Sequence, residues 1–261
     1  MPLSPGLFSR REARLALFDI DGSAADAQAQ ALGPSTRSWQ ADVRSLSELE
    51  RAISEAARHF GGLDVVIANA GCIATESLAT GSPERFEQVV DVNLLGVWRT
   101  FRAALPHVQE RRGYLMAISS MAAFVHSPLQ APYCASKAGV WAMCDSVRLE
   151  LRHLGVDVGC VHPTFFQTPL MQQVFDDPAG NRIWRGNKEG IWKMVPIETV
   201  VTAIVRGIEA RAESVTAPGP GRLIARAPGL FRRLLERIGF SDAEIAETVA
   251  VAARHAGERL R

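Results

Sequence analysis

Residues 113–137 read Gly-Tyr-Leu-Met-Ala-Ile-Ser-Ser-Met-Ala-Ala-Phe-Val-His-Ser-Pro-Leu-Gln-Ala-Pro-Tyr-Cys-Ala-Ser-Lys. An apolar run typical of a buried strand ends at Ser119 and Ser120. Tyr133 and Lys137 follow at the start of residues 132–154, whose apolar spacing is that of a helix. On a helix these two side chains share one face, because they lie four residues apart. The stretch therefore predicts a strand followed by a helix that carries a tyrosine–lysine pair.

This tyrosine–lysine pair suits proton transfer. A phenol with a pKa of about 10 is a poor base at neutral pH. An ammonium roughly 4 Å away favours the phenolate by up to about 4 kcal/mol, or about three pKa units. We therefore expect Lys137 to bring the pKa of Tyr133 near neutrality, while Ser120 polarises a substrate carbonyl. The alternative is a surface pair that arose by chance, and the motifs around the pair decide between the two.

Several short motifs accompany the pair along the chain. They are Asp42-Val43, Asn69-Ala70-Gly71, Asn93 within Asp91-Val92-Asn93-Leu94-Leu95-Gly96, and His162-Pro163-Thr164. In this order and at these distances they resemble the motifs of the short-chain dehydrogenase/reductase family, over about residues 7–217. The resemblance implies an oxidoreductase that transfers a hydride between a nicotinamide dinucleotide and an alcohol or ketone.

The order of apolar runs and helical patterns predicts an α/β fold. Strands are expected at residues 14–18, 38–41, 63–68, 113–119, 156–161 and 214–217, and helices at residues 46–60, 83–111 with an interruption near Asn93, 132–154 and 197–213. Such alternation is typical of βαβ units. We predict a Rossmann-like, doubly wound parallel sheet in a single domain over residues 1–217, with residues 218–261 as a helical extension of that domain.

Composition limits the partners and the compartment. The chain has 261 residues and a net charge of +1, so nothing suggests nucleic acid as a partner. Its four cysteines have no Cys-x-x-Cys spacing, and we expect no disulfide framework and no metal site. The sequence has neither a long uncharged apolar run nor the pattern of a signal peptide at its start. We expect a soluble, cytoplasmic protein that acts on a small molecule.

The resemblance implies a role for each catalytic residue. Tyr133 would be the general acid/base, and Lys137 would lower its pKa and hold the nicotinamide ribose. Ser120 would contact the substrate, whereas Ser119 would be structural. Asn93 would kink the long helix and organise water beside the lysine. A simple helix irregularity is the alternative for Asn93.

The resemblance also implies contacts to the adenosine half of the cofactor. Asn69-Ala70-Gly71 would be a turn whose small residues let the backbone approach the cofactor, with an ordinary strand-end turn as the alternative. Asp42 and Val43 would bracket the adenine, although Asp42 could equally cap a helix. Asp19 would bind the ribose 2′-hydroxyl, which favours NAD over NADP because a 2′-phosphate would meet a like charge.

At the nicotinamide end, the resemblance implies contacts from Pro163 and Thr168. Thr164 stands where the family has glycine. The substrate pocket would be lined by residues 121–130 and 165–194, which carry apolar side chains that favour an apolar alcohol or ketone: Phe124, Phe165, Phe166, Met171, Trp184 and Trp192. His126 could meet a polar group of the substrate, although a loop histidine is more often solvated.

One family motif has no counterpart in this sequence, namely the turn Thr-Gly-x-x-x-Gly-x-Gly that binds the cofactor pyrophosphate at a helix N-terminus. The acidic residue should follow those glycines by about 20 residues, yet the residues before Asp19 contain only Gly6. We therefore expect the first strand, the glycine turn and most of the first helix to be missing, which leaves two interior sheet edges. Five unpaired backbone groups would cost roughly 5 to 15 kcal/mol.

Two hypotheses follow from the missing motif. The favoured one is an NAD-dependent dehydrogenase whose true start lies upstream. The alternative is a shortened product that has lost dinucleotide binding and serves as a binding protein or structural remnant. In both cases we expect residues 1–261 by themselves not to bind NAD tightly.

The remaining expectations concern association. We expect a homodimer or homotetramer that forms through residues 83–111 and 132–154, as is common in the family. Residues 222–237 are basic and amphipathic. The favoured interpretation is a helix packed on the body or on a neighbouring subunit, and the alternative is a substrate-entrance flap or a membrane-surface contact.

Overall fold

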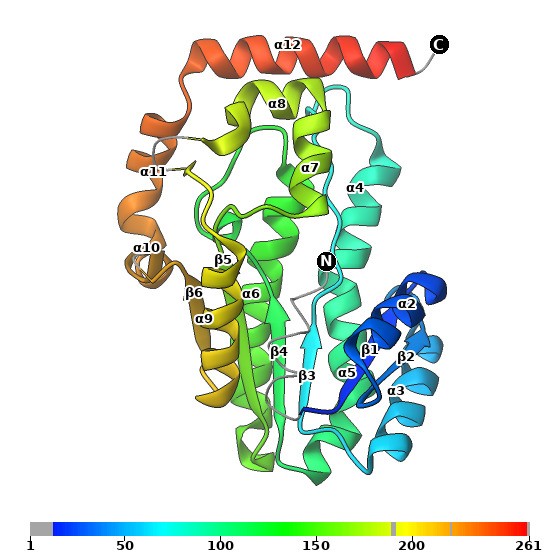
Figure 1. Cartoon of the computed structure of the whole chain (residues 1–261). Helices are drawn as coiled ribbons and strands as arrows, with labels where there is room; N and C mark the ends of the chain where they lie inside the picture. Colours follow the sequence, from blue (N-terminus) through cyan, green and yellow to red (C-terminus); the bar gives the residue numbers. More distant parts are fainter. Residues whose placement is uncertain (1–12, 189–191, 220, 260–261) are drawn as a thin grey trace.

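The structure, a computed structural model, describes residues 13–188, 192–219 and 221–259 and is an α/β fold (Figure 1). Its strands are β1 (Leu15–Asp19), β2 (Thr36–Gln40), β3 (Val65–Ala68), β4 (Tyr114–Ile118), β5 (Asp157–Pro163) and β6 (Ser214–Ala217). Neighbouring strands pair in parallel throughout. All six predicted strands are present, with boundaries that differ by a few residues.

Helices connect the strands. They are α2 (Gly22–Leu32), α3 (Leu46–Phe60), α4 (Pro83–Val90), α5 (Gly96–Glu110), α6 (Ala131–Leu151), α7 (Pro169–Asp176), α8 (Pro178–Trp184) and α9 (Ile197–Glu209). A π-helical turn, η1 (Asp91–Leu95), joins α4 to α5 and confirms the predicted interruption near Asn93. The predicted helix 197–213 is wrong at its end, because the chain turns after Glu209 with Arg211 at φ 47°.

The sheet is divided into two pieces. One piece pairs β1 with β2, and the other has the order β3-β4-β5-β6. Within residues 13–188, 192–219 and 221–259 no strand lies between β1 and β3. Val65 of β3 is 38% exposed, whereas every residue of β4 is buried. The break falls between the two strands where the sequence predicts interior edges.

Helices cover both faces of the larger piece. Side chains of α3, α5 and α6 pack with β3, β4 and β5 into the main core, which includes Ile53, Phe101, Leu115 and Val140. On the other face, Val200 and Ile204 of α9 pack on β4, β5 and β6 (Figure 1). This is the doubly wound arrangement predicted from the sequence.

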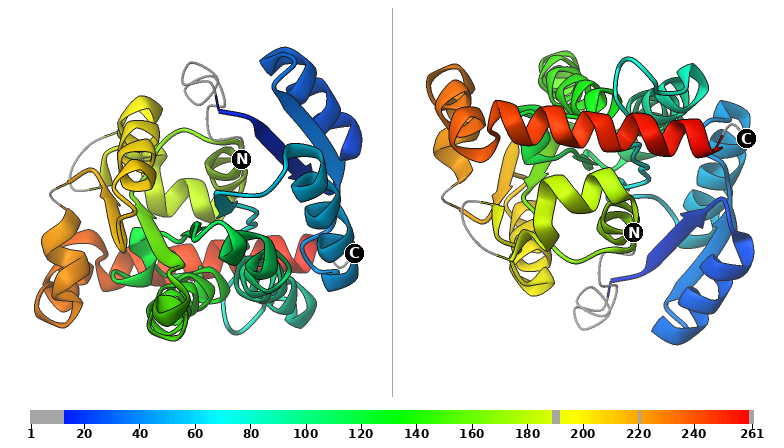
Figure 2. Two further views of the ribbon diagram at one scale, coloured as in Figure 1. Left: turned by 90° about the horizontal axis from the view of Figure 1, so that it is seen from below. Right: turned by 90° about the horizontal axis from the view of Figure 1, so that it is seen from above.

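The last part of the described chain forms helices α10 (Gly221–Arg226), α11 (Pro228–Gly239) and α12 (Asp242–Arg259). Helix α12 crosses the top of the molecule against α8, where Arg182 pairs with Glu247 and Arg185 pairs with Glu244 (Figure 2). None of the helices in the described part of the chain is both long and apolar enough to span a bilayer.

Candidate active site

Tyr133 and Lys137 lie on α6, and Ile118 and Ser120 lie at the end of β4 beside them. The Lys137 side chain is 4% exposed, and its Nζ donates a hydrogen bond of 2.8 Å to the Ile118 carbonyl. The same ammonium lies 5.6 Å from the centroid of the Tyr133 ring. Lys137 is thus buried where α6 meets β4, and the half-buried Tyr133 ring lies beside it, so the two side chains are not a freely exposed surface pair.

The pKa values of the pair differ from the expectation. Burial raises the pKa of Tyr133 to about 12, although hydrogen bonding with the Ser120 hydroxyl lowers it in part. This direction is opposite to the expected fall towards neutrality, because burial penalises the charged phenolate and is the largest influence on this pKa. Burial also lowers the pKa of Lys137 to about 8. At neutral pH Lys137 is still mostly charged, and Tyr133 holds a proton that it can donate.

The two adjacent serines have different surroundings. Ser119 is 2% exposed and its Oγ donates to the Lys137 carbonyl at 2.8 Å, so it ties β4 to α6 as a structural residue should. Ser120 is only partly buried, and its Oγ accepts from the Ala122 amide at 3.1 Å. This bond fixes the Ser120 side chain at the strand end, beside the Tyr133 phenol.

Asn93 links the turn after β3 to α6. It is fully buried in the π-helical turn, where its Nδ2 donates to the Cys72 carbonyl at 2.9 Å and to Ser136 Oγ at 3.2 Å. Its Oδ1 accepts from the Cys72 amide at 2.8 Å. A Cβ added at Gly71 would lie 3.4 Å from Asn93 Oδ1 and 3.8 Å from Lys137 Nζ. The backbone of this turn therefore lies directly beside the lysine.

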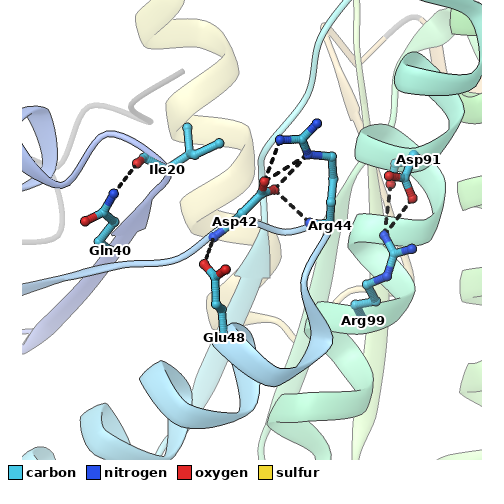
Figure 3. A network of polar contacts seen from close by, with 7 residues as sticks. All are labelled: Ile20, Gln40, Asp42, Arg44, Glu48, Asp91 and Arg99. Carbon is cyan, nitrogen blue, oxygen red and sulfur yellow. Dashed lines mark hydrogen bonds and ion pairs between the residues drawn. The ribbon is translucent and has the colours of Figure 1, made fainter. Parts of the chain in front are cut away.

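Asp42 forms an ion pair that the sequence did not reveal. Its carboxylate accepts from Nε and Nη2 of Arg44 at 2.9 and 2.6 Å (Figure 3), and hydrogen bonding with Arg44 holds the pKa of Asp42 below its ordinary value. The helix-cap alternative for Asp42 is wrong, because Ser45 caps α3 by accepting from the Glu48 amide at 3.3 Å. Glu48 in turn accepts from the Asp42 amide at 3.0 Å.

Asp19 ends β1 on the smaller piece of the sheet. Its Oδ1 accepts from the amide of Asp21, which caps α2. A surface hollow next to this strand end is lined by Ile20, Asp21, Gly22, Ser23, Asp26 and Gln40. The lining carries two carboxylates and no cationic side chain, so this hollow disfavours an additional phosphate group.

The other predicted cofactor residues lie at strand ends. Asn69, partly buried, and Ala70, exposed, directly follow β3. Val43 packs on α5, where a Cβ added at Gly96 would approach Val43 Cγ2 to 2.9 Å. Pro163 is buried at the end of β5, and the Thr168 hydroxyl caps α7 by accepting from the Met171 amide at 3.0 Å. Ser120, Tyr133, Lys137, Asn93 and Gly71 thus meet in one place, whereas Asp19 and Asp42 follow β1 and β2.

Three of the expected pocket residues, Phe124, Phe166 and Trp184, are buried in the core. Phe124 is 2% exposed and packs on Trp141 and His162, and Phe166 is 7% exposed in the core under α9. Four rings form a separate cluster with centroids 4.7 to 6.1 Å apart: Phe165, Trp184, Trp192 and Phe240. Phe240 was not predicted, because it lies far along the chain from the others. His126 contacts Glu236, with Nδ1 3.7 Å from Oε1.

His162 predicts a specific pH dependence of stability. It is fully buried with its ring centroid 4.7 Å from that of Phe124, and burial lowers its pKa to about 4. Between about pH 6.5 and pH 4 the unfolded chain binds a proton that the folded chain does not, so His162 destabilises the fold as the pH falls. We expect His162→Leu to remove about 2 kcal/mol of the stability difference between pH 7 and pH 4.5, measured by urea unfolding. If His162→Leu kept the pH dependence of the parent protein, the assignment would be refuted.

Comparisons with known proteins identify the family. The family described as short chain dehydrogenase matches residues 7–179, so the chain belongs to the short-chain dehydrogenase/reductase family. It is 33% identical over 145 residues to an uncharacterized NAD-dependent oxidoreductase of Mycobacterium tuberculosis, covering 55% of this chain and 53% of the relative. It is 36% identical over 157 residues to (-)-trans-carveol dehydrogenase of Rhodococcus erythropolis, covering 59% and 56%. The chain thus spans about half the length of these relatives.

Solved structures share the fold. A short chain dehydrogenase/reductase from Burkholderia phymatum, in complex with NAD, superposes with a TM-score of 0.75 at 20% identity, covering 88% of this chain and 92% of that one. A 3-ketoacyl-(acyl-carrier-protein) reductase from Brucella melitensis, complexed with NADH, gives a TM-score of 0.69 at 22% identity, covering 83% and 93%. At these identities the likeness concerns the fold.

Proposed function

We propose that this site performs NAD-linked hydride transfer between an alcohol and a ketone, with Tyr133 as the general acid/base. The observation that carries the proposal is the convergence of Ser120, Tyr133 and Lys137, with Asn93 holding the turn beside the lysine. NAD, when bound, accepts the hydride from the alcohol or, as NADH, delivers one to the ketone. The residues of the chain manage the proton.

The roles follow from the chemistry of each group. In the direction of reduction, the Ser120 hydroxyl holds the substrate oxygen and the protonated Tyr133 donates to it, which suits a tyrosine whose pKa is about 12. In oxidation the same phenol oxygen must take the proton, and the mostly charged Lys137 below it favours the phenolate. Its short bond to the Ile118 carbonyl keeps the ammonium in place.

The residues fit the two ends of a nicotinamide dinucleotide but not its middle. At the nicotinamide end, the Gly71 backbone lies close to Lys137, since a Cβ added at Gly71 would be 3.8 Å from Lys137 Nζ. At the adenosine end, Asp19 offers a carboxylate for the ribose. For the pyrophosphate, the sequence contains no Thr-Gly-x-x-x-Gly-x-Gly turn. The second candidate function is a non-catalytic remnant that uses the fold for binding.

The preference for NAD over NADP rests on charge. Asp19, Asp21 and Asp26 lie at or near the end of β1, and the neighbouring hollow has no cationic lining residue. A ribose 2′-phosphate would meet these carboxylates. Arg44 is already paired with Asp42. We therefore infer NAD, with a carboxylate-bound ribose.

An apolar substrate agrees with the aromatic cluster. Phe165 and Trp192 belong to the segment that follows β5, and Trp184 and Phe240 pack on them. Ile73, which follows Cys72 in the turn near Lys137, packs against the core group that contains Trp184 and Phe240. We infer an apolar alcohol or ketone, which agrees with the name of the carveol dehydrogenase relative.

The experiment is a dehydrogenase assay with an alcohol series of increasing apolar size, with NAD and with NADP. Two proteins are assayed: residues 1–261, and the same residues preceded by a strand, glycine turn and helix taken from an NAD-dependent relative. Activity of the second protein, greater with NAD than with NADP, is the expected result. A second protein that binds NAD and yet turns over no alcohol or ketone would support the remnant.

Association through the long helices is also proposed. Exposed apolar side chains lie on α4, the π-helical turn, α5 and α6, with exposed fractions of 42% for Phe86, 43% for Leu95, 47% for Trp98 and 60% for Leu149. Exposed large apolar side chains on neighbouring helices are typical of a subunit interface. We infer a homodimer or homotetramer, and a monomeric mass by light scattering at micromolar concentration would contradict it.

The cysteines support a cytoplasmic location. All four are free thiols, and the buried Cys144 and Cys160 are close enough to hydrogen-bond without forming a disulfide. Reduced neighbouring thiols are typical of the cytosol. Alkylation of the protein as taken from cells should find four thiols, and a Cys144–Cys160 disulfide would contradict this location.

A further inference from the structure

Helix α11 exposes an aliphatic stripe. Leu230 is 74% exposed, Leu234 is 58% exposed and Ile238 is 64% exposed. The three residues are four apart, so they lie one above another on a single face of the helix. Exposed large aliphatic residues are ordinary when they are single, but a row of three on one helix indicates a surface that meets an apolar partner.

The opposite face of α11 fixes how the helix lies. Leu235 packs on the core group that contains Phe124 and Val125. Glu236 accepts from the His126 amide at 3.4 Å and lies 3.9 Å from Arg232 Nε. The inner face is therefore attached to the body of the molecule, as the favoured interpretation of residues 222–237 expects. The stripe must then point away from the body, and Figures 1 and 2 show α10 and α11 at one edge of the molecule.

Positive charge borders the stripe. Arg233 and Arg237 are exposed, one turn apart, on the flank of the aliphatic row. The preceding helix α10 adds exposed Arg222 and Arg226 and Leu223, which is 68% exposed. Residues 221–239 contain five arginines and one glutamate, a net charge of +4 in a chain whose total is +1. No ion pair within the described part of the chain involves Arg222, Arg226, Arg233 or Arg237.

The aliphatic row and the arginines beside it together indicate which partner binds this surface. A second copy of the chain would bring a second group of arginines against the first, and like charges oppose such an interface. An anionic bilayer surface offers acyl chains for the aliphatic row and lipid phosphates or carboxylates for the arginines. We propose that α10 and α11 bind the surface of an anionic membrane, with Leu230, Leu234 and Ile238 inserted at the level of the headgroups. The helix lies in the plane of the surface and does not cross the bilayer.

The test is co-sedimentation of the full chain with vesicles. One set contains phosphatidylcholine and phosphatidylglycerol in equal amounts, and the other contains phosphatidylcholine alone. We expect binding to the mixed vesicles that is at least about tenfold stronger than to the neutral ones and that weakens with salt. The variant L230Q/L234Q and the variant R233Q/R237Q should each reduce binding by about tenfold or more.

Matched controls distinguish binding through this surface from nonspecific adsorption of the protein to vesicles. L78Q changes a leucine that is 96% exposed elsewhere, and R58Q changes an exposed arginine on α3. Neither should reduce binding, and all variants should keep the unfolding midpoint of the parent because every substituted side chain is exposed. Equal binding to both vesicle types, or equal loss in the controls, would overturn the proposal. The proposal would also be overturned if the parent protein stayed in the supernatant and the L230Q/L234Q variant had a smaller oligomeric mass than the parent. A second copy of the chain would then cover the stripe.

Discussion

Tyr133→Phe should reduce kcat by about a thousandfold in a form of the protein that binds NAD. The variant keeps the ring beside Lys137 and removes the hydroxyl that we propose exchanges a proton with the substrate oxygen. General acid–base catalysis by one positioned side chain contributes about 10² to 10⁴ in rate. The KM for the alcohol should change much less, because Ser120 still holds the substrate oxygen. Steady-state kinetics at saturating NAD measure both constants.

Tyr114 provides the matched control, since it is the only other tyrosine in the chain. It is fully buried, and its hydroxyl donates to the Ala212 carbonyl at 2.7 Å, between β4 and the turn after α9. Tyr114→Phe loses one hydrogen bond and leaves a carbonyl unpaired, so we expect about 1 to 2 kcal/mol of lost stability and an unchanged kcat. If Tyr133→Phe kept more than about a tenth of the activity, Tyr133 would not be the acid.

The fold was predictable where apolar periodicity is strong. Helix α3 begins and ends at the predicted residues, because Ser45 caps it and Gly61 ends it at φ 77°. Helix α2 was not predicted. Its residues Gly22–Leu32 are mostly alanine, glutamine and other small or polar residues, and only Ala25 and Ala29 are buried. The capping Asp21 was a usable signal, because its side chain accepts from the Ala24 amide at 3.0 Å.

The proximity of the candidate site residues was predictable from the sequence, but their electrostatics were not. Motif spacing identified Ser120, Tyr133, Lys137 and Asn93, which the structure brings together. The pKa of Tyr133 could not be predicted, because spacing gives the distance of a cation but not the burial of the phenol. The Asp42–Arg44 pair was also missed. Two residues of opposite charge near each other in sequence are common, and only the loop conformation makes them a bidentate pair.

The gap in the sheet between β1 and β3 is the feature whose repair we expect to change NAD affinity most. Among the described residues, β1 pairs only with β2 and β3 pairs only with β4, and both pairs are parallel. A parallel strand between them would satisfy both edges, and a glycine turn after it would direct backbone amides at a pyrophosphate. We expect residues 1–261 to show no micromolar affinity for NAD by calorimetry. The version preceded by a strand, glycine turn and helix should bind at least about a hundredfold tighter.

A second version of the grafted protein, which again carries the added strand, turn and helix, tests strand pairing separately from phosphate binding. In this version only the second glycine of the turn is replaced by valine, so the strand can still pair with β1 and β3 while the backbone can no longer approach a phosphate. It should regain the stability of the first graft, several kcal/mol above residues 1–261 if about five backbone groups become paired, and should still fail to bind NAD. Equal NAD affinity in both grafts would mean that the strand alone organises the cofactor site. Micromolar affinity in residues 1–261 would mean that Asp19 and the turn at Gly71 suffice to hold the dinucleotide without the glycine turn.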